Sequence, residues 1–168
     1  IIITLVMLLC ACNMQEQQTQ LAQIKAQNKI RVGTLASASN YYQAVQGEQG
    51  FEYELSQAFA DYLGVELEIV PFFNLSDMFE RLESGDLDLI ASGLTYNKVR
   101  AQQYRYGPTY RTISQKLVYK QGRVRPREFD DLDGNFTVIA KSSHSLTLQK
   151  IKKSNPDLTW QETEELDE

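Results

Sequence analysis

The sequence of 168 residues predicts an α/β fold built on a parallel sheet. Apolar runs with strand character, at 30–35, 65–70 and 87–92, are separated by segments with helical spacing of apolar residues. Glycine or proline stands at the ends of several of these segments. Both cysteines lie near the start and the chain holds a single histidine, so no disulfide, metal site or cofactor is predicted.

The segment from residue 21 to residue 63 predicts a helix, a strand, a long connection and a second helix. Residues 21–27 form a short amphipathic helix, and 30–35 form a strand. The small and polar residues at 36–50 are a long connection. Apolar residues at helical spacing predict a helix over 51–63, which Gly64 ends.

A second βα unit follows. The alternating residues 65–70 predict a strand up to Pro71. Either Asn74 or Ser76 can cap the next helix, which ends at Ser84 and Gly85.

The remaining elements are less regular. The apolar run 87–92 predicts a third strand, followed by a turn and a helix that begins near Asn97. Residues 112–119 are β-rich, and the basic stretch 120–127 is either a crossing between two lobes or a solvated linker.

A new βα unit opens with a strand at 136–140. Its helix starts between 143 and 145, runs to about 153, and is followed by the start of another strand at 158–160.

The N-terminal segment has a different character. Residues 1–12 are almost wholly apolar but too few for a membrane span, which needs about twenty residues. They match the hydrophobic core of a signal peptide whose beginning is missing, and LCAC at 9–12 resembles the lipobox of bacterial lipoproteins. In that case Cys12 is acylated and anchors the protein, and Asn13 favours the outer membrane. The alternative is an ordinary buried strand.

Charge argues against one class of partner. The net charge is −5, and five acids lie within 162–168; the rest of the chain has 17 acids and 17 bases. A neutral body lacks the positive field that captures phosphate backbones, so nucleic-acid binding is not expected.

Candidate binding residues fall at the carboxyl ends of the predicted strands, where open α/β sheets bind ligands. Tyr41 or Tyr42 can supply an aromatic wall, Gly93 an unobstructed carbonyl, and Thr95 a hydroxyl and an N–H. Arg100 can hold a carboxylate with two parallel hydrogen bonds. Taken singly, each residue also fits an ordinary role in packing, capping or surface charge.

The second half of the chain offers a matching feature. Residues 141–145 place backbone N–H groups at a helix N-terminus, which is a ready anion site. Two half-sites that face each other across a hinge would form a clamshell.

Several motifs carry a family resemblance: GFEYEL at 50–55, LDLIASGLT at 87–95, Arg100 and GPTY at 107–110. The chain resembles the bacterial family 3 solute-binding proteins of amino-acid transport. This implies a periplasmic-binding-protein-like fold, with a nearly complete first lobe and the beginning of a second. By position, Gly93, Thr95 and Arg100 would bind the amino and carboxylate groups of a ligand. Ser143 and His144 would close on the carboxylate from the second lobe.

A narrower resemblance adds GLTYN at 93–97, the run 107–120 and RPR at 125–127. These segments are similar to the solute-binding-like module of membrane-bound lytic murein transglycosylases. The resemblance implies a non-catalytic module attached to a lysozyme-like domain that lies past this sequence and cleaves peptidoglycan glycan strands, leaving 1,6-anhydromuramoyl ends. We therefore assign no catalytic residue, and we interpret Glu52 and Glu54 as first-turn acids that stabilise a helix dipole.

The predicted organisation is a signal peptide and lipobox at 1–12, a tether with a short helix at 13–28, lobe 1 at 29–120, an inter-lobe connection at 121–134, and the start of lobe 2 at 135–168. We expect the sequence to be cut short at both ends, and residues 13–168 alone to be poorly soluble.

Three functions remain open. The first is a regulatory module that binds a small carboxylate-bearing ligand, a muropeptide or an amino acid, on the periplasmic face of the outer membrane. Its further partners would be peptidoglycan, through the catalytic domain, and the membrane, through the lipid anchor. The second is an amino-acid-binding lipoprotein of a transport system, and the third is an interaction scaffold without a ligand.

Overall fold

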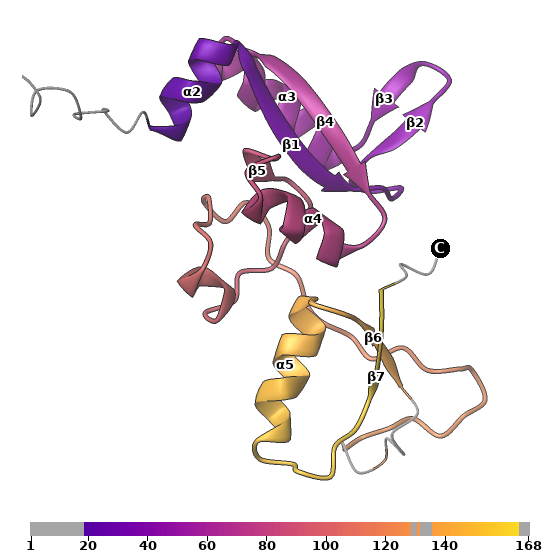
Figure 1. Cartoon of the computed structure of the whole chain (residues 1–168). Helices are drawn as coiled ribbons and strands as arrows, with labels where there is room; N and C mark the ends of the chain where they lie inside the picture. The colour runs from indigo at the N-terminus through magenta and orange to yellow at the C-terminus, as the bar shows by residue number, and fades with distance from the viewer. Residues whose placement is uncertain (1–18, 129–130, 132–135, 165–168) are drawn as a thin grey trace, which may run out of the picture.

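The first lobe is organised around a three-stranded parallel sheet in the order β4-β1-β5 (Figure 1). The computed structural model describes residues 19–128, 131 and 136–164. The proposed signal peptide, Cys12 and the first part of the tether lie outside these residues. Within the described part of the chain, no helix has the length and apolar character needed to cross a membrane.

The N-terminal helix and strand match their predictions. Helix α2 (Gln20–Gln27) begins after Thr19, whose hydroxyl accepts a hydrogen bond from the Ala22 N–H at 3.3 Å. It ends at Asn28, whose φ of 53° is in the left-handed region common at helix ends. Strand β1 (Lys29–Leu35) follows directly and forms the centre of the sheet.

Both neighbours of β1 run parallel to it. Strand β4 (Glu66–Phe72) pairs along its whole length, and it continues through Pro71. The proline is tolerated because β4 is an edge strand, where a missing N–H leaves no partner unpaired. Strand β5 (Leu89–Ile90) is shorter than the predicted strand at 87–92.

Helices α3 and α4 bury different sets of side chains. Helix α3 (Phe51–Leu63) has the predicted bounds and ends at Gly64, whose φ is +71°. The helix buries Glu52, Ser56 and Ala60, whereas the aromatic residues Phe51 and Phe59, which helped to predict it, are 50% and 43% exposed. Helix α4 (Leu75–Glu83) buries Leu75, Met78 and Phe79. Its cap is Asn74 and not Ser76, because the Asn74 side chain accepts from the Asp77 N–H at 2.8 Å.

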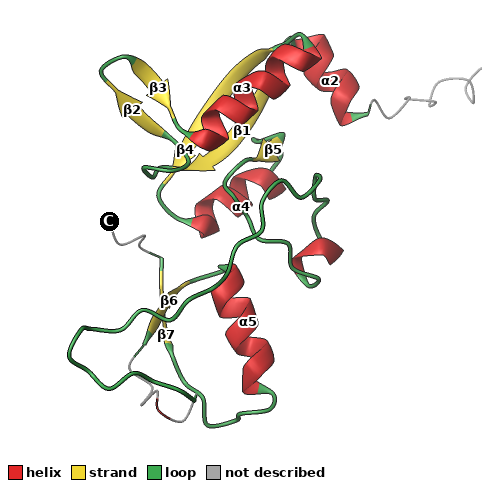
Figure 2. Ribbon diagram, turned by 180° about the vertical axis from the view of Figure 1, so that it is seen from behind, coloured by secondary structure: helices red, strands yellow, loops and turns green. Residues whose placement is uncertain are grey.

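The alternation of β1 gives the lobe two cores. Ile30 and Val32 pack with Ile24 of α2 and Ala60 of α3. Leu35 packs in the other core, whose remaining buried side chains are Leu75, Met78, Phe79 and Leu87. Figure 2 shows α3 and α4 on either side of the β1–β4 ribbon.

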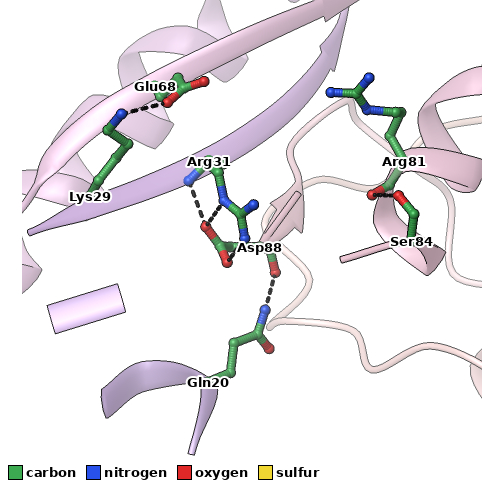
Figure 3. Close-up of polar contacts among 7 residues, drawn as sticks. All are labelled: Gln20, Lys29, Arg31, Glu68, Arg81, Ser84 and Asp88. Atoms are coloured by element: carbon green, nitrogen blue, oxygen red, sulfur yellow. Dashed lines mark hydrogen bonds and ion pairs between the residues drawn. The ribbon is translucent and has the colours of Figure 1, made fainter. Parts of the chain in front are cut away.

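A partly buried ion pair between Arg31 and Asp88 lies near the amino ends of β1 and β5 (Figure 3). The carboxylate of Asp88 accepts from the Arg31 backbone N–H at 2.8 Å, and from Nε and Nη2 of the same residue at 3.0 and 2.9 Å. The Gln20 side chain donates to the Asp88 carbonyl at 2.8 Å. Helix α2, β1 and the segment before β5 are therefore tied together at the end of the sheet opposite the predicted binding residues.

Three predictions about the loops need correction. The connection 36–50 contains an antiparallel hairpin, β2 (Tyr42–Ala44) and β3 (Gly47–Gln49). The helix expected near Asn97 is only the 3₁₀ turn η1 (Arg100–Gln102). The β-rich run 112–119 forms no strand, because no other described segment pairs with it, and its side chains are exposed.

The second part of the chain is a small βαβ unit. Strand β6 (Thr137–Ile139) pairs in parallel with β7 (Gln161–Thr163), and helix α5 (Ser143–Lys152) connects them. The predicted helix is confirmed. The last strand was predicted to begin at 158–160, but β7 begins three residues after position 158, at Gln161. Ser142 caps α5 by accepting from the Ser145 N–H at 3.2 Å.

Candidate functional site

The candidate site lies where the first lobe meets the loop before α5. Strand β1 ends at Leu35, whose N–H donates to the Ser92 hydroxyl at 3.1 Å and so fixes the turn that follows β5. Asn97 orders the next turn, because its side-chain oxygen accepts from the Val99 N–H at 2.8 Å. These local bonds position Gly93, Thr95 and Arg100 along one segment.

Arg100 connects the two parts of the chain. Its side chain is buried, with 7% exposure, and its Nη2 donates to the carbonyl of Lys141. The guanidinium lies 4.8 Å from the centre of the Phe79 ring, a cation–π distance. Lys141 has a φ of +55°, and it stands just before the capping residue of α5. The predicted carboxylate-binding group therefore lies next to the predicted anion site of lobe 2.

A pocket of about 210 Å³ opens beside this contact. Arg100 and Lys141 line it together with Phe79, Tyr104 and Leu146. The hydroxyl of Tyr104 donates to Glu83, and burial together with this hydrogen bond raises the pKa of Tyr104 to about 12. The lining of the pocket also includes the carboxylate of Glu83, so it combines apolar walls with the buried Arg100 and one acidic group. Of the predicted binding residues, Arg100 is the one that lines it.

Gly93 and Thr95 lie on the same segment but make different contacts. Gly93 has a φ of +59°, which favours glycine. A Cβ at this position would lie 3.4 Å from both the Glu52 Oε1 and the Arg111 Nη2. The carbonyl of Thr95 accepts from the Tyr106 hydroxyl at 3.4 Å.

The two predicted tyrosines stabilise the β2–β3 hairpin. Tyr41 donates to Glu48 at 2.8 Å, a bond that raises the pKa of Tyr41, and its ring meets that of Tyr53 edge to face. Tyr42 donates to the Gln49 side chain at 2.9 Å and is 41% exposed. Their role as an aromatic wall for a ligand stays a prediction.

The predicted residues of lobe 2 lie in the first turn of α5. The Ser143 hydroxyl accepts from the Gln115 side chain at 3.2 Å, which adds a second link to the segment before lobe 2. The Ser143 carbonyl accepts from the Thr147 hydroxyl at 2.8 Å. His144 is exposed. The contact with Arg100 is made by Lys141, which the sequence did not single out as a ligand-binding residue.

A buried carboxylate near Gly93 was not predicted. Glu52 is 1% exposed; its Oε1 accepts from the Tyr110 hydroxyl at 2.7 Å, and its Oε2 is buried with no hydrogen-bond donor among the described residues. Burial, and then the bond to Glu52, raise the pKa of Tyr110 to about 12. One signal was available: Glu52 shares its helix face with the small residues Ser56 and Ala60, which allow close packing on the sheet.

Within the described part of the chain, no three His, Cys, Asp or Glu side chains are grouped so that they could hold a metal ion. A second hollow, of about 360 Å³, lies on the other flank of α4 and contains none of the predicted binding residues.

Comparison with curated proteins gives consistent relatives. The chain is 89% identical over all its 168 residues to membrane-bound lytic murein transglycosylase F of Pseudoalteromonas translucida, and spans 36% of that protein. It is 46% identical over 145 residues to the protein of the same name from Yersinia enterocolitica, covering 86% of this chain and 30% of that protein. The chain thus spans about a third of the length of these relatives.

Solved structures with a similar fold are amino-acid-binding proteins. An ancestral amino-acid-binding protein, described as a precursor of cyclohexadienyl dehydratase, has a TM-score of 0.70 at 27% identity, over 88% of this chain and 66% of that chain. An ancestral arginine-binding protein bound to arginine has a TM-score of 0.69 at 26% identity, over 82% of this chain and 61% of that chain.

The family assignment agrees with the fold and with these relatives. Parallel βαβ units on both sides of the Arg100–Lys141 contact are the architecture that the motifs predicted. A family model matches residues 30–168, nearly the whole described chain. The chain therefore belongs to the bacterial extracellular solute-binding proteins, family 3.

Proposed function

We propose that this chain is the non-catalytic, ligand-binding regulatory module of a lytic murein transglycosylase. Enzymes of this class degrade peptidoglycan glycan strands with formation of 1,6-anhydromuramoyl ends. The proposal is supported by the family 3 match over residues 30–168 and by relatives named membrane-bound lytic murein transglycosylase F. No residue of this chain is assigned to bond cleavage.

One observation carries the binding step: the buried guanidinium of Arg100 links the first lobe to the loop before α5. In this arrangement its hydrogen-bond acceptor is the neutral carbonyl of Lys141. A ligand carboxylate is a better acceptor for a guanidinium, because charged hydrogen bonds are shorter and stronger and can form in pairs. We infer that the ligand carboxylate takes the place of this carbonyl.

The surrounding groups complete the proposed site. Gly93 and Thr95 lie on the segment that leads to Arg100 and offer backbone groups to the ligand. The first turn of α5, with Ser143 and His144, offers N–H groups to the same carboxylate. The pocket of about 210 Å³ beside Arg100 has room for a group about the size of a single amino acid.

Regulation follows from the position of Arg100 between the lobes. A ligand that replaces the Lys141 carbonyl removes the hydrogen bond that joins the two lobes. It therefore shifts the equilibrium between different relative positions of the lobes. We propose that this shift alters the activity of the attached transglycosylase domain.

The proposed location is the periplasmic face of the outer membrane. It rests on the LCAC segment at 9–12, in which an acylated Cys12 would be the anchor, followed by Asn13. Mass spectrometry of the N-terminal peptide of the protein purified from membranes tests the lipid anchor: a diacyl or triacyl Cys12 supports it, and an unmodified cysteine contradicts it.

A second candidate is an amino-acid-binding lipoprotein of a transport system. The observation that favours it is the similarity to solved amino-acid-binding proteins. Sequencing the gene beyond Glu168 separates the two: a lysozyme-like domain supports the transglycosylase, and a stop codon soon after the second lobe supports the transport protein.

Titration calorimetry on the full-length protein tests ligand binding. Muropeptides and amino acids are titrated into the unsubstituted protein and into Arg100→Ala, with Arg105→Ala as a matched control that removes an exposed arginine nearby. We expect Arg100→Ala to lose at least about tenfold in affinity and Arg105→Ala to bind normally. Thermal melts show whether each variant is folded. Arg100→Lys keeps the positive charge but loses the planar fork, so it separates the effect of the charge from that of two parallel hydrogen bonds. If the unsubstituted protein binds nothing, the fold is a scaffold.

For regulation, release of anhydromuropeptides from purified peptidoglycan is measured with and without the ligand. We expect the ligand to change the rate in the unsubstituted protein but not in Arg100→Ala. An unchanged rate at saturating ligand would refute the regulatory role.

A further inference from the structure

We propose that Arg111 is a second cationic ligand-binding residue of this site, selective for ligands that carry an additional carboxylate, and that the Glu52–Tyr110 hydrogen bond is what positions it. This inference rests on the proposed ligand-binding function. It adds a contact that the motifs around Gly93 and Arg100 do not include.

The position of Arg111 is the first argument. Its Nη2 lies 3.4 Å from the point that a Cβ on Gly93 would occupy, so the guanidinium is beside the predicted ligand-binding turn. The guanidinium also lies over the Phe51 ring, 5.8 Å from its centre. Arg111 is exposed, whereas Arg100 is 7% exposed and donates to Lys141. Of the two, Arg111 is the guanidinium that is open to solvent.

The anchoring of residues 110 and 111 is the second argument. Tyr110 donates to the buried carboxylate of Glu52 at 2.7 Å. Its ring packs against Phe51 at 5.8 Å with an angle of 34° between the planes. Residues 112–120, which follow directly, are exposed and form no strand. The bond to Glu52 therefore fixes Arg111 at the first turn of α3, at the point where the chain leaves the lobe.

The unpartnered oxygen of Glu52 is the third argument. Buried polar atoms in folded proteins nearly always have a hydrogen-bond partner. The Glu52 Oε2 is buried without a donor in the described part of the chain, while its Oε1 accepts from Tyr110 and lies 3.4 Å from the point that a Cβ on Gly93 would occupy. A buried carboxylate with one oxygen unsatisfied costs stability, because that oxygen has lost its hydration without gaining a donor. We assign to this carboxylate the role of positioning Tyr110, and through it Arg111.

The chemistry of the ligand follows from the two guanidinium groups. Arg100 lies at the contact between the lobes and serves one carboxylate under the proposed function. The exposed guanidinium of Arg111, which lies over the Phe51 ring, is a planar fork of N–H donors that matches a second carboxylate. The ligand class is therefore an acidic amino acid, or an acidic peptide with a free side-chain or terminal carboxylate.

Two matched ligand pairs test this with the full-length protein. L-glutamate and L-glutamine differ by one carboxylate at nearly the same shape, and the second pair is a cell-wall peptide with its glutamate carboxylate free or amidated. Titration calorimetry is run on the unsubstituted protein, on Arg111→Gln and on Lys116→Gln, which removes the same charge from the neighbouring exposed run. We expect Arg111→Gln to weaken the acidic ligand about tenfold and its amide less than about twofold. Lys116→Gln should change neither.

Tyr110→Phe tests the positioning role, because it removes only the hydroxyl and keeps the ring on Phe51. We expect it to weaken the acidic ligand of each pair by about threefold and to leave the amide unchanged. A purely structural role would weaken both ligands equally.

The outcomes separate the two proposals. If the unsubstituted protein binds a pair and Arg111→Gln weakens both members equally, or neither, the role of Arg111 is refuted while the binding function stands. If the unsubstituted protein binds none of these ligands, the proposed function fails and this inference falls with it.

Discussion

The partly buried pair of Arg31 and Asp88 gives a sharp test of what holds the first lobe together. The Asp88 side chain, 8% exposed, accepts three hydrogen bonds from Arg31, one from the backbone N–H and two from the guanidinium. We consider the replacement Asp88→Ala, which removes all three acceptors at once. The Arg31 side chain is 29% exposed, so water can reach part of the freed guanidinium.

The expected cost follows from these contacts. Hydrogen bonds to charged groups contribute about 1.5–3 kcal/mol, and a backbone N–H left without a partner costs about 1–3 kcal/mol. Hydration of the guanidinium offsets part of the sum. We therefore expect Asp88→Ala to lower the free energy of unfolding by about 2–4 kcal/mol.

The matched control is an exposed ion pair between the neighbouring strands β1 and β4. Lys29 and Glu68 lie 2.9 Å apart, but their side chains are 45% and 46% exposed, and exposed pairs contribute little. Urea unfolding followed by circular dichroism compares Asp88→Ala with Glu68→Ala, and hydrogen exchange at the Arg31 amide gives a local reading. If Asp88→Ala costs no more than Glu68→Ala, or if the Arg31 amide stays equally protected, the reasoning is wrong.

The same pair predicts a pH dependence. Burial raises the pKa of Asp88, but the side-chain and backbone hydrogen bonds from Arg31 outweigh it, so the pKa lies below the ordinary value of 3.8. The ionised form therefore stabilises the fold above the unfolded pKa, and this stability is lost as the pH falls through the lower folded pKa. The stability difference between the unsubstituted protein and Asp88→Asn should be constant near neutral pH and shrink below about pH 4.

Three further predictions concern the site and the exposed segment. Gly93→Ala forces a side chain into a φ of +59°, so it should cost about 1–2 kcal/mol in urea unfolding and weaken ligand binding in calorimetry; an unchanged affinity would contradict the role of this turn. The protonated hydroxyl of Tyr110, with a pKa of about 12, should stabilise the fold fully below pH 10 and lose this effect as the pH rises to about 12. Alkaline unfolding of Tyr110→Phe should lack that contribution, and identical curves would argue against it. Residues 13–168 alone should aggregate in light scattering, because Ile113 and Leu117 are about half exposed; a monodisperse protein with a cooperative melt would overturn this.

Local signals predicted the regular elements well. The bounds 51–63 of α3 were right because Gly64 provides the left-handed residue that ends a helix, and this depends only on neighbours along the chain. The cap of α4 was left open between Asn74 and Ser76, since both residue types can accept from a helix N–H. The hairpin at 42–49 was missed because its strands are only three residues long and carry no apolar alternation.

The β-rich run 112–119 shows the limit of strand propensity. Its residue types favour an extended chain, but a strand also needs a neighbour for its N–H and C=O groups. No described segment supplies one, so the run stays irregular and exposed.

The sequence by itself determined the parallel βαβ pattern, the helix ends and the family, because periodicity, capping and glycine positions act over a few neighbouring residues. It also placed Gly93, Thr95 and Arg100 on one segment. Only the tertiary structure decided that Arg100 meets Lys141, 41 residues away, and that Glu52 holds Tyr110, 58 residues away. Such partners depend on the path of the whole chain, since burial and hydrogen bonding join groups by distance in space and not by distance in sequence.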